Sequence, residues 1–129
     1  MTLIELIKLD EGFIATVYKD SLGFDTVGYG TKMPLSREEG ELLLKYRLDI
    51  TEKNLLNNLH YLSISHEAWE ILYNMAYQMG VNGVIKFTKM IKALRIKDYN
   101  EAANQMLDSK WAKQTPQRAN RLADRMRGI

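Results

Sequence analysis

The sequence predicts an α+β fold dominated by helix, with a small β lobe near the N-terminus and a larger helical lobe after it. One stretch, residues 16–31, has strand-like composition: it alternates β-branched and aromatic residues and is interrupted by turn-forming ones. From residue 36 onward, apolar residues recur three and four positions apart, as on the buried face of helices. A single β segment followed by many helices is typical of this class.

The length and composition fit one globular domain. With 129 residues, 46% of them hydrophobic, the chain can bury a core without disulfides or metal ions. The absence of Cys excludes a disulfide scaffold, a thiol nucleophile and Cys-based metal sites. The spacing of the two His residues brings no carboxylate pair with it, and no phosphate-binding glycine loop or G-x-S-x-G motif is present. We therefore expect neither a metal nor a cofactor.

Charge and hydropathy limit the classes of partner that the chain can be expected to bind. A net charge of +2 is too small to indicate nucleic acid as a partner. No apolar run approaches the ~20 residues of a membrane-spanning helix, and the first residues lack the basic start of a secretory signal. Residues 1–30 hold five acids and two lysines, a net charge of −3, whereas residues 110–129 hold six bases and one acid, a net charge of +5. The basic end either faces the acidic one in the fold or is a solvated helix face.

The N-terminal segment predicts a helix followed by a β-hairpin. Thr2 and Glu5 have the spacing of a capping box and begin a helix over residues 2–10, which Gly12 ends. The hairpin occupies residues 16–31, with its turn in the sequence DSLG.

Capping residues also mark the later helices. Ser36 and Glu39 form a second capping box before one long helix, or two helices joined near Thr51, which connects the two lobes. Further helices are expected from Ser65 to Gly80, over residues 84–94 and 100–107, and after Thr115 and Pro116, where Thr caps and Pro takes the first helical position.

A pair of carboxylates is the strongest candidate for chemistry. Glu11 ends the first helix, where the helix dipole disfavours negative charge, and Asp20 lies nine residues later in a polar turn. A chain that passes from a helix into a hairpin can direct both groups into one crevice, which suits acid–base cleavage of a glycoside. Thr26, on the returning arm, could hold a water beside Asp20. The alternatives are two solvated acids and a threonine that serves only its strand.

Four blocks of sequence, LDEGF, VYKDSLGFDTVGYGT, YQMGVNGVIKFT and SKWAKQTPQRANR, together resemble the T-even type of bacteriophage lysozymes, glycoside hydrolase family 24. They occur in the family's order between Leu9 and Arg121. The family's E-x8-D-x5-T pattern falls on Glu11, Asp20 and Thr26. The resemblance implies a two-lobed lysozyme-like fold within one domain, residues 1–129, with the active site between the lobes. The expected lobes are a β lobe over residues 12–35, a helical lobe over residues 1–11 and 60–129, and a connecting helix over residues 36–60.

The resemblance implies an inverting muramidase that cuts the β-1,4 bond between N-acetylmuramic acid and N-acetylglucosamine in peptidoglycan. Glu11 is then the general acid, Asp20 activates a water, and Thr26 helps to hold that water. An inverting mechanism predicts roughly 6.5–9.5 Å between the two carboxyl groups.

The same resemblance suggests residues that bind substrate. Arg118 matches the family's arginine that pairs with the acid, and Tyr77 and Gln78 match an aromatic–Gln pair on the cleft wall. Gln105 falls where the family presents an amide, and Gly30 matches a glycine that lets substrate approach the backbone. Two departures concern the β lobe: Thr31 replaces a His that is common in the family, and the stretch over residues 32–37 is short, so a reduced lobe is expected.

The implied biological role is lysis of a bacterial host by a monomeric phage endolysin. It would wait in the host cytoplasm, without stable membrane insertion, until a separate pore-forming holin releases it to the cell wall. Three alternatives stay open: a virion-associated lysozyme that penetrates the wall, a non-catalytic peptidoglycan-binding module, and a membrane-disrupting protein that acts through its basic C-terminal helix.

Overall fold

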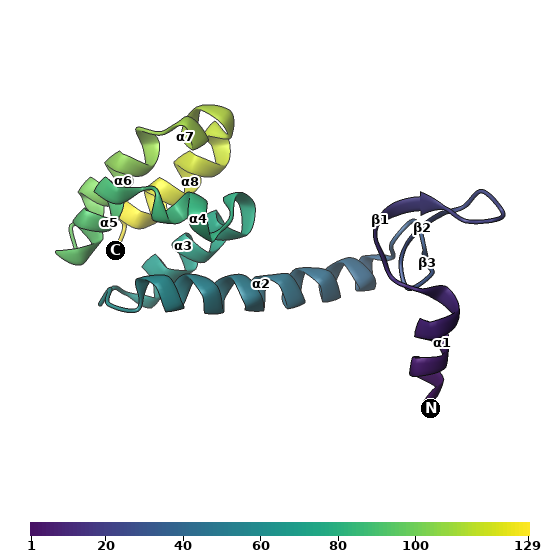
Figure 1. The fold of residues 1–129 in the computed structure, drawn as a ribbon. Helices are drawn as coiled ribbons and strands as arrows, with labels where there is room; N and C mark the ends of the chain where they lie inside the picture. The colour runs from purple at the N-terminus through teal and green to yellow at the C-terminus, as the bar shows by residue number, and fades with distance from the viewer. The chain divides into compact units, whose positions relative to one another are not determined.

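The computed structural model describes all 129 residues and divides into two compact units, an N-terminal unit (Met1–Leu43) and a helical unit (Leu44–Ile129) (Figure 1). Three short strands among eight helices confirm the predicted α+β class dominated by helix. In chain order the elements are α1 (Leu3–Glu11), β1 (Ile14–Lys19), β2 (Asp25–Gly28), β3 (Thr31–Lys32), α2 (Arg37–Leu59), α3 (His66–Met79), α4 (Val81–Ile85), α5 (Thr88–Arg95), α6 (Tyr99–Leu107), α7 (Lys110–Gln114) and α8 (Pro116–Arg127).

Helix α1 has the predicted capping box. The hydroxyl of Thr2 accepts the backbone N–H of Glu5 at 3.2 Å, and the Glu5 carboxylate accepts the backbone N–H of Thr2 at 2.8 Å. Gly12 ends the helix at a φ of 68°, and its N–H donates to the carbonyl of Lys8. This helix end places Glu11 just before the sheet, with its side chain exposed.

Strands β1 and β2 form the predicted hairpin, and β3 adds a third antiparallel strand beside β2. The register pairs Thr26 with Tyr18 on one side and with Lys32 on the other. Thr26 therefore lies in the central strand, where it is 1% exposed and is the one buried residue of the N-terminal unit.

Helix α2 is a single helix of 23 residues. Its predicted capping box is present: the N–H of Ser36 donates to the Glu39 carboxylate, and the Ser36 hydroxyl accepts the N–H of Glu39. The boundary of the two units falls inside this helix, between Leu43 and Leu44. The expected lobe boundaries, with residues 1–11 in the helical lobe, stay a prediction.

The hydrophobic core lies in the helical unit. Ser65 caps α3 as predicted, since its hydroxyl accepts the N–H of Ala68 at 3.1 Å. Four of the seven Met residues are fully buried there, as expected for flexible side chains that fill gaps between helices. The largest buried apolar side chains are Leu55, Leu59, Ile71, Leu72, Met75, Val84, Met90, Leu94, Met106 and Met126.

The helix expected over residues 84–94 is wrong in one respect, because the chain forms two helices there. Helix α4 ends at Ile85 and α5 begins at Thr88. Phe87 between them leaves the helical conformation, with a ψ of 62°, and its ring packs edge-on against Trp111, centroid to centroid 6.2 Å. The break thus coincides with a contact to a distant helix.

The start of the last helix also differs from the expectation. Pro116 does occupy the first turn of α8, but Thr115 does not cap it. The Thr115 hydroxyl donates instead to the carbonyl of Trp111 at 3.0 Å, because α7 ends directly before it. Helix α7 was not predicted, although Ser109 caps it by accepting the N–H of Ala112.

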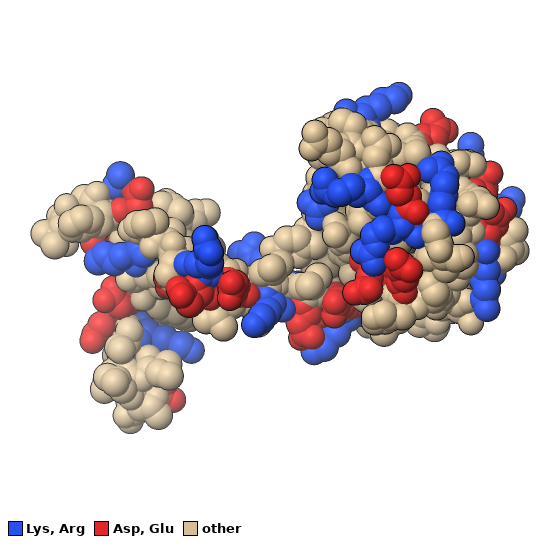
Figure 2. All heavy atoms as spheres, turned by 180° about the vertical axis from the view of Figure 1, so that it is seen from behind, with Lys and Arg blue, Asp and Glu red and all other residues tan.

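The basic C-terminal helix, α8, has one side buried in the core of the helical unit and the other side exposed on its surface. On the side shown in Figure 2, Lys and Arg are interspersed with Asp and Glu over this unit. Arg125 lies 3.4 Å from Glu67 and 3.6 Å from Glu70, both on α3. The apolar stripe of α8, which includes Leu122 and Met126, is buried, so exposing it to a bilayer would require unfolding.

None of the helices combines the length and the apolar character needed to span a membrane.

Truncation of a core side chain should separate buried from exposed leucines. Leu72→Ala, at a fully buried site, should lower the free energy of unfolding by about 2–5 kcal/mol because it removes buried surface and leaves a cavity. Leu56→Ala, at a residue 45% exposed, is the matched control and should cost much less. Urea denaturation followed by circular dichroism measures both, and equal losses would contradict the placement of the core.

Candidate active site

The turn between β1 and β2 fixes the carboxylate of Asp20. Oδ1 accepts two backbone N–H groups, that of Leu22 at 2.9 Å and that of Phe24 at 2.8 Å. The backbone N–H of Asp20 donates in return to the carbonyl of Phe24 at 2.9 Å. Aspartate commonly organises turns by accepting the N–H two residues ahead. The local sequence therefore orients this side chain, which is 15% exposed.

Lys32 holds the other oxygen of the same carboxylate. Its Nζ lies 2.5 Å from Oδ2 of Asp20. This hydrogen bond, and then that from the Phe24 N–H, lowers the pKa of Asp20 below its ordinary value, so the group stays ionised further into acid. Sequence reasoning missed Lys32, which stands twelve positions from Asp20. The contact depends on the register of β2 with β3, which pairs Lys32 with Thr26 and is set only in the folded sheet.

Gly30 lies against the carboxyl group of Glu11. A Cβ placed on Gly30 would come within 2.6 Å of Glu11 Cδ, closer than real Cβ atoms approach other groups, and the φ of Gly30 is 73°. The resemblance assigned this glycine to the approach of substrate; the structure shows that it makes room for the acid itself. Within the N-terminal unit, the side chain of Glu11 makes no hydrogen bond or ion pair.

Thr26 is positioned by its strand. Its hydroxyl donates to the carbonyl of Phe24 at 3.0 Å, and the residue is 1% exposed. In this arrangement the hydroxyl oxygen can accept a hydrogen bond, but its proton is already engaged. Donation of this proton to a water would need rotation of the hydroxyl. Its role in holding water stays a prediction.

These residues form one group, the carboxylate cluster, defined as Glu11, Asp20, Thr26, Gly30 and Lys32. Lys32 connects its members: the hydrogen bond and charge of Asp20, and then the charge of Glu11, raise the pKa of Lys32. Two carboxyl groups in different surroundings, one tied by three donors and one free, are what acid–base hydrolysis of a glycoside requires. No three His, Asp or Glu side chains converge to hold a metal ion.

Tyr77 and Arg118, both predicted to bind substrate, line one hollow of the helical unit with a volume of about 370 Å³. The guanidinium of Arg118 makes three hydrogen bonds to Asn74. Nε and Nη2 donate to the side-chain Oδ1 at 2.9 and 2.7 Å, and Nη2 also donates to the backbone carbonyl at 3.1 Å. Tyr77 is 41% exposed. Glu11 belongs to the other unit, so its expected pairing with Arg118 stays a prediction.

Gln78 has a structural partner. Its Oε1 accepts the indole N–H of Trp111 at 2.8 Å, which satisfies the only donor of a side chain that is 8% exposed. The amide NH₂ of Gln78 has no partner within the protein and is the part of this side chain that a substrate could use.

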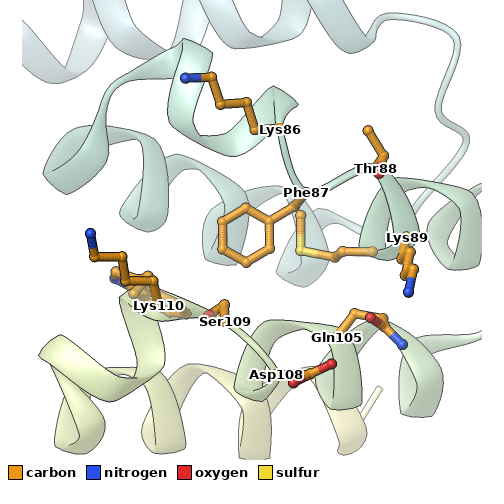
Figure 3. A pocket seen from close by; sticks show the side chains of 10 residues that line it. Lys86, Phe87, Thr88, Lys89, Gln105, Asp108, Ser109 and Lys110 are labelled. Carbon is orange, nitrogen blue, oxygen red and sulfur yellow. The ribbon is translucent and has the colours of Figure 1, made fainter.

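Gln105 lies in a different hollow of the helical unit, with a volume of about 290 Å³ (Figure 3). The ring of Phe87 points into this hollow, and Gln105 and Asp108 lie on the opposite wall. The amide of Gln105 donates to Glu101 at 3.0 Å. The structure therefore does not bring Gln105 into the hollow lined by Tyr77 and Arg118, and its contact with substrate stays a prediction.

Comparison with known proteins identifies relatives along nearly the whole chain. The sequence profile of the family described as Phage lysozyme matches residues 8–127. Probable T4-type lysozymes 1 and 2 of Dictyostelium discoideum are 29% and 27% identical; the matches cover 92% and 94% of this chain and 89% and 91% of the relatives. The pre-baseplate central spike protein Gp5 of Enterobacteria phage T4 is 30% identical over 95% of this chain, which corresponds to 27% of Gp5.

The alignment lengths point to a shortened chain. The match to T4-type lysozyme 1 runs over 151 positions, whereas this chain has 129 residues, so at least 22 positions (151 − 129) have no counterpart here. The expectation that the stretch over residues 32–37 is the shortened part stays a prediction. In the structure, β3 (Thr31–Lys32) has two residues and α2 begins at Arg37.

Substitution of Gly30 should move Glu11 without unfolding the protein. Gly30→Ala places a methyl group where the Glu11 carboxyl lies, and the flexible end of that side chain should swing away. Gly23→Ala is the matched control, because Gly23 has a φ of 86° but open space around it. Both variants should lose about 1–2 kcal/mol of stability from the left-handed backbone. Carboxyl ¹³C NMR should show an altered Glu11 only in Gly30→Ala; an unchanged Glu11 signal would contradict the contact.

Proposed function

The chain belongs to the phage lysozyme family and is a lysozyme, and we propose that it hydrolyses the β-1,4 bond between N-acetylmuramic acid and N-acetylglucosamine in peptidoglycan with inversion at the anomeric carbon. The carboxylate cluster is the observation that carries this proposal. It supplies a free carboxyl group on Glu11 and a tied, ionised carboxylate on Asp20 within one unit. The bond and the stereochemistry are those that the family resemblance implies.

The two acids divide the reaction between them. Glu11 donates its proton to the glycosidic oxygen while the bond from that oxygen to the anomeric carbon breaks. A water on the opposite face of the sugar forms the new bond to this carbon and gives a proton to Asp20. Exchange with solvent then removes the proton from Asp20 and restores the one on Glu11. Thr26 accepts a hydrogen bond from the attacking water in this scheme.

The helical unit supplies the proposed sugar contacts. The exposed ring of Tyr77 offers a flat apolar face to a pyranose, and the NH₂ groups of Gln78 and Gln105 can donate to N-acetyl carbonyls. Arg118, held by Asn74 beside Tyr77, is a further proposed contact to substrate. Gly30 gives the acid Glu11 its space.

For the biological role, we propose a monomeric endolysin that stays in the host cytoplasm until a holin releases it, and then acts on the wall. A particle-borne lysozyme is the second candidate, which the 30% identity to a phage spike protein favours. Mass spectrometry of purified phage particles separates the two. Stoichiometric recovery of the chain with intact particles would favour the second, and its recovery only in the soluble lysate would favour the first.

Removal of either acid should abolish turnover and leave the fold intact. Glu11→Gln and Asp20→Asn should each lower the rate of peptidoglycan hydrolysis by about 10²–10⁴-fold, because one loses the proton donor and the other the base. Asp10→Asn, next to Glu11 but outside the cluster, is the matched control and should keep the wild-type rate. Turbidity loss of purified walls, with assay of new reducing ends, gives the rates.

Wild-type turnover by Glu11→Gln would contradict the proposed acid. Wall binding without turnover by the wild type would favour the non-catalytic module. The anomer of fresh product, followed by proton NMR, tests inversion: an α-configured reducing end is expected from a β linkage, and a β-configured end would contradict the role of Asp20 as base.

A further inference from the structure

We propose that Lys32 is a positioning residue for Asp20: its ammonium group takes one of the two acceptor positions on Oδ2 and leaves the other for the water that attacks the sugar. The proposal rests on the proposed function, because it takes Asp20 to be the group that receives the proton of that water.

The count of hydrogen bonds defines this position. An ionised carboxylate has about four lone-pair sites, two on each oxygen. The N–H groups of Leu22 and Phe24 take both sites of Oδ1, and Lys32 takes one site of Oδ2. One site of Oδ2 remains. A base with one open site can accept a proton from one direction only.

Tertiary structure brings the lysine to this carboxylate. Asp20 stands in the turn after β1, whereas Lys32 ends β3, two strands away. The ion pair therefore ties the turn to the far edge of the sheet, next to Thr26, with which Lys32 is paired. Lys32 therefore restrains Oδ2 of Asp20, whereas the N–H groups of the turn reach only Oδ1.

The surrounding charges leave Lys32 as the ionic partner of Asp20. From α1, Glu11 acts on Lys32 through its charge, as does Tyr18 of β1 when ionised. Lys19 of β1 is engaged by Asp25 of β2 at 2.6 Å. Lys32 thus has carboxylates near it from α1 and from the turn after β1, and it donates to the second of them, Asp20.

The sign of the pH effect follows from this pairing. Lys32 favours the ionised form of Asp20 and lowers its pKa, so the base stays active further into acid. Without the ammonium group, Asp20 becomes protonated at a higher pH, and the acid limb of the activity profile moves upward in pH.

Three variants test the proposal. Lys32→Met removes the charge and the donor, Lys32→Arg keeps both, and Lys19→Met removes the other cation of the hairpin without touching Asp20. Peptidoglycan hydrolysis is measured against pH for each, and the Asp20 carboxyl is titrated by ¹³C NMR, which does not depend on turnover. Lys32→Met should show an upward shift of both the acid limb and the Asp20 pKa, Lys32→Arg should restore both, and Lys19→Met should match the wild type.

The outcomes distinguish this proposal from the function on which it rests. An unmoved Asp20 titration in Lys32→Met, or the same shift in Lys19→Met, would overturn the role of Lys32 and leave Asp20 as the base. An Asp20→Asn variant with wild-type turnover would overturn the base itself, and the positioning role with it. Loss of activity in Lys32→Met with an unmoved acid limb, not rescued by Lys32→Arg, would indicate a merely structural lysine and also overturn the proposal.

Discussion

The orientation of the Asp20 carboxylate depends on its ion pair with Lys32, which joins the hairpin turn to the third strand. Only Thr26 is buried in this unit, so apolar burial does little within it to fix the hairpin turn relative to the third strand. Short strands with few buried side chains are weakly specified on their own. The ladder fixes the strands, the turn fixes one oxygen of Asp20, and Lys32 fixes the other. The ion pair between Asp20 and Lys32 thus restrains the turn relative to the third strand, as a buried side chain does in larger sheets.

The carboxyl groups of Glu11 and Asp20 differ in the hydrogen-bond donors that surround them. Asp20 has three donors and its charge is stabilised, whereas Glu11 projects from the last turn of α1 beside a glycine that gives it space. Environment, rather than side-chain type, sets acid apart from base in such pairs. Lys32 lies near both carboxyl groups, so its charge favours ionisation of the closer one, to which it donates.

The helical unit is stabilised mainly by buried apolar side chains rather than by polar contacts. Leu72, Met75 and Met106 are fully covered, and close packing of this kind makes a rigid frame. Polar contacts are then set on that frame: Arg118 grips Asn74, and Gln78 receives the indole N–H of Trp111. Of the side chains predicted for substrate, Tyr77 and Arg118 line one hollow and Gln105 lines another.

Local sequence was sufficient for features that arise within a few residues. The capping boxes at Thr2 and Ser36 and the turn at Asp20 are contacts between near neighbours, and the carboxylate pair was proposed from its spacing and its resemblance to a family pattern. The break at Phe87 accompanies a contact with Trp111, 24 positions away, and the partner of Asp20 depends on strand register, so neither could be predicted. Thr115 illustrates the same limit, because its hydroxyl turned to a carbonyl of the preceding helix. Sequence alone determined which groups could react, because chemistry belongs to side chains; the tertiary structure decided which donors surround them, because only folding brings distant residues within hydrogen-bond distance.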